Sequence, residues 1–88
     1  MKKLFKRHYQ AIILRGLITD NTNINDFLRK IEEEFIELCI EQENDKFIQE
    51  AIDLIMVCVN MLQYKGVNIE SELLKNILVQ EKRAKLNK

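Results

Sequence analysis

Apolar residues recur every three or four positions along most of this chain of 88 residues, which is the spacing that places them on one face of an α-helix. Proline is absent and glycine occurs only twice, so long segments run without a residue that breaks helices. The pattern predicts an all-α protein of four helices, over about residues 2–17, 23–43, 44–65 and 68–86.

Local signals mark the expected helix ends. Gly16 and Gly66 stand where the first and third helices should close, because glycine readily adopts the left-handed backbone that ends a helix. Asparagine side chains can accept a hydrogen bond from the free amides at a helix start, and the expected caps are Asn23 or Asn25, Asn44 and Asn68. We expect one domain over residues 1–88, which at this size would gain stability by assembling as an oligomer.

The third helix carries a polar strip in an otherwise apolar sequence. From Phe47 to Leu62 it is apolar nearly all round, which predicts a buried helix. Four of its polar-tipped side chains lie within about 80° of one another on a helix with 3.6 residues per turn, and they are Glu50, Asp53, Asn60 and Tyr64. The strip is either the solvent-exposed face of the helix or a functional site, and the alignment of all four favours a site.

The second helix places a matching acidic pair beside its apolar face. Glu34 falls about 20° from Phe27 around the helix axis, and Glu37 follows at i+3. If the two helices pack antiparallel, both acidic pairs can converge. Buried carboxylates repel each other and need a positive charge. Oxygen ligands without nearby histidine or cysteine favour Mg²⁺ or Mn²⁺ over Zn²⁺, and the candidate ligands are Glu34, Glu37, Glu50 and Asp53.

Charge and cysteine usage add limits to this hypothesis. The net charge is zero, but residues 16–53 hold eleven acidic and three basic side chains, whereas residues 1–15 hold five basic and none acidic. This distribution suits a metal with an anionic ligand, but on charge alone ordinary solvated helix faces are the favoured interpretation. Cys39 and Cys58 lie in apolar segments, so we expect them to be reduced core residues of a cytoplasmic protein. His8, the only histidine, is expected at the surface or in packing.

The acidic motifs resemble those of a known group of enzymes. The sequence Glu33-Glu34-x-x-Glu37-Leu38 followed by Glu50-x-x-Asp53 is similar to the signature of the MazG-like all-α nucleoside triphosphate pyrophosphohydrolases. Dimeric dUTPases and phosphoribosyl-ATP pyrophosphohydrolases belong to the same superfamily. The resemblance covers about residues 24–86, which is most of the chain.

The resemblance implies a function and roles for particular residues. A Mg²⁺ ion held by the four carboxylates would bind a nucleoside triphosphate, and water would cleave it to a nucleoside monophosphate and pyrophosphate. Glu33 or Glu37 would act as the base. Nucleotide-binding residues would be Asn60, Tyr64, Lys75, Lys82 and Arg83, the basic ones acting across a subunit boundary in a homodimer or homotetramer. We expect neither a membrane nor a nucleic acid as a partner.

Two other classes of protein would carry the same sequence features. The first is a non-catalytic helical protein that binds a metal or a nucleotide with the same carboxylates. The second is a structural dimerisation module with an acidic surface. Release of pyrophosphate from nucleotides distinguishes the enzyme from both, and stabilisation by Mg²⁺ distinguishes the first from the second.

Overall fold

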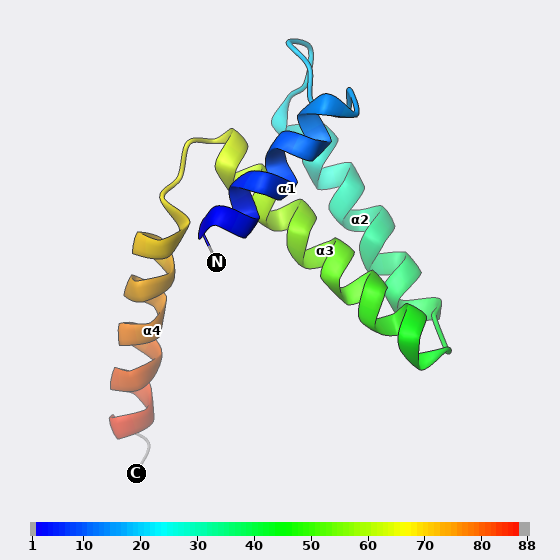
Figure 1. Ribbon diagram of the computed structural model, residues 1–88. Helices are drawn as coiled ribbons and strands as arrows, with labels where there is room; N and C mark the ends of the chain where they lie inside the picture. The colour runs from blue at the N-terminus through cyan, green and yellow to red at the C-terminus, as the bar shows by residue number, and fades with distance from the viewer. Residues whose placement is uncertain (1, 87–88) are drawn as a thin grey trace.

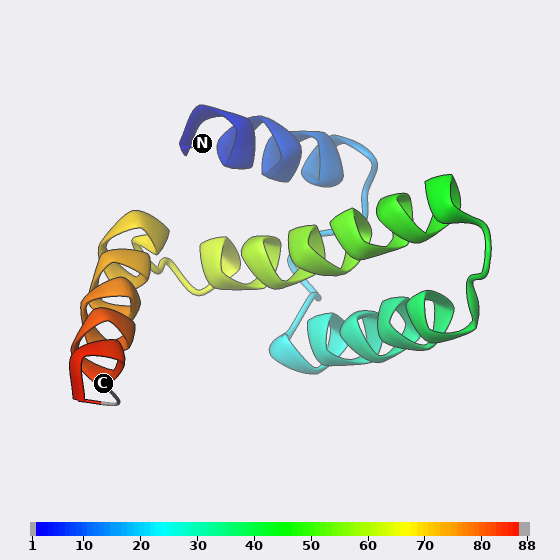
Figure 2. The same ribbon diagram turned by 90° about the horizontal axis from the view of Figure 1, so that it is seen from below.

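The computed structural model describes residues 2–86, and within that range it contains four α-helices and no strand. The helices are α1 (Lys2–Leu14), α2 (Ile24–Ile40), α3 (Asn44–Tyr64) and α4 (Ile69–Leu86). Helices α2 and α3 form an antiparallel pair, and α1 packs on the other side of α3, so that α3 lies between them (Figures 1 and 2). The prediction of an all-α chain with four helices is confirmed.

Most of the predicted helix ends are confirmed by their hydrogen bonds. The Asn23 side chain accepts from the Asn25 amide at 2.9 Å, and the Asp26 carboxylate accepts from the Asn23 amide at 2.9 Å, which together make a capping box. The hydrogen bond from the Asn23 amide is the main reason why the pKa of Asp26 lies below its ordinary value, and the contact with Arg29 lowers this pKa further. At the start of α4, Asn68 accepts from the Ser71 amide at 3.1 Å.

The predicted cap of α3 is wrong. Asn44 is the first residue inside the helix, and the cap position is held by Glu43, whose side chain makes no capping hydrogen bond. The Glu41 side chain instead accepts from the Glu43 amide at 3.0 Å. The loop of three residues between α2 and α3 is therefore ordered by an acidic side chain, and α3 begins one residue earlier than an asparagine cap would allow.

Both glycines close a helix in the same way. Gly16 and Gly66 each have φ of 75°, a left-handed conformation that a side chain disfavours. The amide of Leu17 reaches back to the Ile12 carbonyl at 3.2 Å, and the amide of Val67 reaches the Leu62 carbonyl at 3.0 Å. These are Schellman closures, and they set the direction in which the chain leaves α1 and α3.

The buried core of a single chain is small. Among residues 2–86 the buried apolar side chains are Phe27 and Val59, and the buried polar ones are Glu34 and Asn60. The expectation that α3 is buried on all sides is wrong for one chain, because Ile52 and Ile55 are about half exposed. Cys39, expected in the core, is also exposed.

Helix α3 is the one helix of the described range that is long and apolar enough to cross a membrane, judged by length and composition alone. The central helix of a water-soluble protein meets the same criterion. Here α3 carries Glu50, Asp53 and Asn60 along its length and contacts α1, α2 and α4.

Helix α4 extends away from the other three. It meets α3 near the turn that joins them and then runs outward (Figures 1 and 2). The chain exposes 7313 Å², whereas a compact protein of 10.5 kDa exposes about 5,400 Å². Much of this surplus is apolar, and on α4 it includes Leu73, Leu74, Ile77 and Leu78.

Candidate metal and nucleotide site

Three carboxylates from two helices meet in the α2–α3 pair. One oxygen each from Glu34, Glu50 and Asp53 lies within 4.8 Å of the others. Glu34 comes from α2, and the other two come from successive turns of α3. The three differ in exposure, since Glu34 is buried, Glu50 is half-buried and Asp53 is exposed. The antiparallel packing that the sequence required for this convergence is therefore present.

Two oxygens of this cluster have no hydrogen-bond partner within residues 2–86. They are Glu34 Oε2 and Glu50 Oε2, and both atoms are buried. The other oxygen of Glu34 is paired, because Lys30 Nζ lies 3.1 Å from Oε1. A buried carboxylate oxygen without a partner is costly. The orphaned oxygens are hard donors of the kind that Mg²⁺ and Mn²⁺ prefer, so the cluster fits a divalent cation.

The electrostatics of the cluster point the same way. Burial raises the pKa of Glu50 above its ordinary value, and the neighbouring Glu37 raises it further through hydrogen bonding and negative charge. The charges of Glu34 and Asp53 add to this effect. Glu37 is therefore a neighbour of the cluster, although the group of oxygens within 4.8 Å contains only the other three predicted ligands.

The second candidate base lies differently. Glu33 is exposed and lies 3.5 Å from the Lys30 ammonium. Lys30 thus lies between Glu33 and Glu34 on α2, and its pKa is raised, mainly by its hydrogen bond with Glu34. Of the two glutamates predicted as bases, Glu37 is the one that interacts with Glu50.

Asn60 and Tyr64 lie further along α3 and are held by other parts of the chain. Asn60 is 4% exposed, and its Nδ2 lies 3.1 Å from His8 Nδ1 in α1. The Tyr64 hydroxyl donates to the Thr22 carbonyl at 2.7 Å, and its ring packs on Phe27 with the ring centroids 5.0 Å apart. Tyr64 thus helps to fix the start of α2 against the end of α3.

A cavity of about 330 Å³ follows the acidic cluster along the α2–α3 pair. Residues from α1, the loop after it, α2 and α3 line this cavity, and they are Ile12, Arg15, Leu17, Ile18, Thr22, Asp26, Phe27, Lys30, Val57 and Asn60. Lys30 therefore lines the cavity and also pairs with Glu34. Asn60, predicted to contact a nucleotide, is part of this wall, whereas Tyr64 is not among the lining residues.

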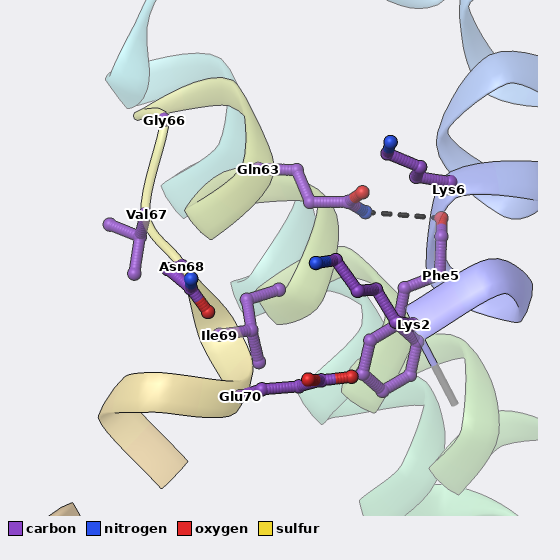
Figure 3. Close-up of a pocket in the computed structure, with 9 residues that line it drawn as sticks. All are labelled: Lys2, Phe5, Lys6, Gln63, Gly66, Val67, Asn68, Ile69 and Glu70. Atoms are coloured by element: carbon purple, nitrogen blue, oxygen red, sulfur yellow. Dashed lines mark hydrogen bonds between the residues drawn. The ribbon is translucent and has the colours of Figure 1, made fainter.

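A second cavity, of about 220 Å³, lies between α1 and the start of α4 and contains none of the predicted site residues (Figure 3). Lys2, Lys6 and Glu70 lie at its edge, and Gln63 Nε2 donates to the Phe5 carbonyl at 3.1 Å beside it. This contact and the His8–Asn60 contact both join α1 to α3.

The basic residues predicted to face phosphates do not reach the acidic cluster within one chain. Lys75, Lys82 and Arg83 all lie on α4, which runs away from the α2–α3 pair (Figure 1). Lys75 pairs with Glu72 in its own helix at 3.1 Å. A role for these cations at the cluster therefore needs the α4 of another copy.

Neither the role of Lys30 nor the contact of His8 was predicted from the sequence. Lys30 precedes Glu34 by four residues, and this spacing places the two side chains side by side on a helix, so the signal was present. His8 and Asn60 are 52 residues apart, and no local pattern connects them.

Comparison with known proteins identifies the family. The family model for phosphoribosyl-ATP pyrophosphohydrolase matches residues 17–78, a segment that includes α2, α3 and the acidic cluster but not α1. Neither the curated proteins nor the solved structures give a significant match. The family match confirms the resemblance to the MazG-like pyrophosphohydrolases that the acidic motifs suggested. The chain belongs to the phosphoribosyl-ATP pyrophosphohydrolase family and is an enzyme that hydrolyses a phosphoric anhydride.

Proposed function

We propose that this protein hydrolyses phosphoribosyl-ATP, the substrate named by its family, with Mg²⁺ or Mn²⁺ as cofactor. The bond cleaved lies between the α- and β-phosphates of the triphosphate, so that the products are phosphoribosyl-AMP and pyrophosphate. The observation that carries the proposal is the group of three carboxylates within 4.8 Å, two of which have a buried oxygen without a partner.

The residues of the cluster have separate tasks in this reaction. Glu34, Glu50 and Asp53 would hold the divalent cation, which when bound neutralises phosphate charge and polarises the phosphoryl group. Glu37 is the better placed of the two candidate bases to take a proton from the attacking water, because it interacts with Glu50, whereas Glu33 is exposed and interacts with Lys30. Lys30 keeps a positive charge between the cluster and the cavity.

We also propose that the active protein is a homo-oligomer in which α4 packs against another copy. The surplus exposed area is about 1,900 Å² relative to a compact chain, more than twice the roughly 800 Å² that one partner contributes to a standard interface. The exposed leucines and isoleucine of α4 supply an apolar surface for that contact. Such packing would let Lys75, Lys82 and Arg83 of one copy approach the acidic cluster of another.

Pyrophosphate release tests the proposed reaction. Purified protein with Mg²⁺ should release pyrophosphate from phosphoribosyl-ATP, and Asp53→Asn should lower kcat/KM by about 100-fold or more, the scale seen when a charge-stabilising group is removed. Asp45→Asn is the matched control, because Asp45 lies in the first turn of the same helix and outside the cluster. The control should retain activity within about twofold.

Two results would contradict the proposal. If no pyrophosphate is released from phosphoribosyl-ATP or from a panel of nucleoside triphosphates, the protein is a binding or dimerisation module instead of an enzyme. If Asp53→Asn is as active as Asp45→Asn, the acidic cluster is not the catalytic metal site. If pyrophosphate is released from other triphosphates but not from phosphoribosyl-ATP, the proposed type of reaction is supported and the proposed substrate is wrong.

A further inference from the structure

Helix α1 forms part of the wall of the larger cavity although it lies outside the segment that matches the family. The match begins at residue 17, whereas α1 ends at Leu14 and contributes Ile12, followed by Arg15, to the cavity wall. Two contacts fix α1 on α3: His8 Nδ1 lies 3.1 Å from Asn60 Nδ2, and the Phe5 carbonyl accepts from Gln63 at 3.1 Å. The cavity is thus partly built by a segment that the family comparison does not describe.

The cavity and the acidic cluster are neighbours along the same helix pair. On α2 the cavity is lined by Asp26, Phe27 and Lys30, and the cluster begins one turn later at Glu34. The eight residues from Asp26 to Glu34 span about 12 Å of helix. A ligand whose triphosphate is held at the cluster can therefore extend its remaining part into the cavity.

The wall of the cavity combines apolar surface with a buried amide. Phe27 and Asn60 are both buried, and aliphatic side chains from α1, the following loop and α3 complete the apolar part. The side-chain oxygen of Asn60, Oδ1, has one hydrogen-bond partner within residues 2–86, namely Gln63 Nε2, which donates at the long distance of 3.5 Å. A volume of about 330 Å³ is in the lower range of small-molecule sites.

One positively charged side chain that lines the cavity, Arg15, forms no ion pair with another described residue. Of its charged lining residues, Asp26 is engaged by the Asn23 amide and by Arg29, and Lys30 pairs with Glu34. Arg15 forms no ion pair with any residue of the described range 2–86. It directly precedes Gly16, whose left-handed turn fixes the direction of the chain at the end of α1. A planar guanidinium suits a phosphate group.

We propose that this cavity receives the phosphoribosyl end of the substrate and that Arg15 binds its phosphate monoester. This inference rests on the proposed reaction at the acidic cluster, and it adds a specificity-determining residue from outside the family-matching segment. Arg15 then distinguishes phosphoribosyl-ATP from ATP, since ATP carries the same triphosphate but lacks the second, distant phosphate.

A comparison of two substrates tests this role of Arg15. Arg15→Ala should lower kcat/KM for phosphoribosyl-ATP by about 10- to 100-fold, the loss expected when a charged hydrogen bond to phosphate is removed, and should change kcat/KM for ATP by less than about threefold. Arg15→Lys should recover part of the loss. Arg7→Ala is the matched control, because Arg7 is exposed on α1 and lines neither cavity. Equal losses on both substrates would overturn the proposal.

Binding of ribose 5-phosphate in EDTA gives a readout that does not depend on catalysis. In nuclear magnetic resonance spectra, titration should shift the signals of Phe27 and Asn60, with a dissociation constant at least about tenfold weaker in Arg15→Ala and unchanged in Arg7→Ala. Absence of shifts at the cavity, or equal weakening by both variants, would overturn the proposal. If these shifts occur while neither substrate is hydrolysed, the proposed reaction fails and the phosphate site stands.

Discussion

Replacement of Glu50 by glutamine distinguishes two effects of the acidic cluster. One is its electrostatic cost in the metal-free protein, and the other is its proposed role in binding a metal. Burial and the neighbouring carboxylates, Glu37 first, raise the pKa of Glu50 in the folded protein. Between the unfolded and the folded pKa, the folded state holds more protons than the unfolded state, so stability falls as pH rises through that window. Above the folded pKa, the loss of stability caused by the charge on Glu50 reaches its full value. Glu50→Gln removes the charge, and the metal-free variant should therefore melt at pH 7.5 at the same temperature as the wild type or higher.

With Mg²⁺ present, the wild type should melt at a higher temperature than Glu50→Gln. A ligand present at one hundred times its dissociation constant stabilises a folded protein by about 2.7 kcal/mol. For a domain of this length that corresponds to a rise in Tm of roughly 10–20 °C. With Mg²⁺ the wild type should show such a rise, because one oxygen from each of three carboxylates lies within 4.8 Å of the others. Glu50→Gln removes one of the two orphaned buried oxygens of the cluster and should lose most of the rise.

Differential scanning fluorimetry from pH 7.5 down to pH 5.5, with EDTA or with Mg²⁺, measures both effects. Glu32→Gln is the control, since Glu32 lies on α2, two residues before Glu34, and is exposed and outside the cluster. It should keep the wild-type pH dependence and the Mg²⁺ response. A large loss of stability in metal-free Glu50→Gln would refute the reasoning, because it would mean that the carboxylate is held by favourable contacts and carries no penalty.

Two further predictions concern the fold and its assembly. Asn23→Ala removes the cap of α2 and should lower the free energy of unfolding, measured with urea, by about 1 kcal/mol. Asn25→Ala, inside the same helix, should leave this free energy unchanged. Equal effects of the two variants would mean that the cap is not formed in solution. Ile77→Glu places a charge on the exposed apolar face of α4 and should lower the molecular mass measured by light scattering. Gln80→Glu adds the same charge to α4 without removing an apolar side chain and should leave the mass unchanged. If Ile77→Glu also leaves the mass unchanged, α4 is not part of the interface.

Sequence-local features of the fold were predictable because their causes are local. The cap at Asn23 and the closures at Gly16 and Gly66 depend on residues within one or two turns. The burial of Glu34 followed from its position beside the apolar stripe of its helix, and the structure confirms it at 6% exposed. The error at Asn44 is also local, since the glutamate before it took the cap position.

Features that join distant segments were not predictable from periodicity. The contact of His8 with Asn60 depends on how α1 lies across α3, and a repeat of apolar residues gives no such angle. The apolar pattern of α3 and α4 indicated which of their faces are apolar, but not which segments pack on those faces. This is why Ile52 and Ile77 are exposed in one chain although the sequence places both on apolar faces.

The graded exposure of the three clustered carboxylates has a consequence for ion exchange. Glu34 is closed off from solvent while Asp53 faces it, so an ion held by these residues would be open to bulk water on one side. Mg²⁺ gives up its hydration shell reluctantly, and a one-sided site lets it retain part of that shell. A triphosphate would reach such an ion from the side of Asp53, so that binding of the substrate would not need to displace the buried Glu34.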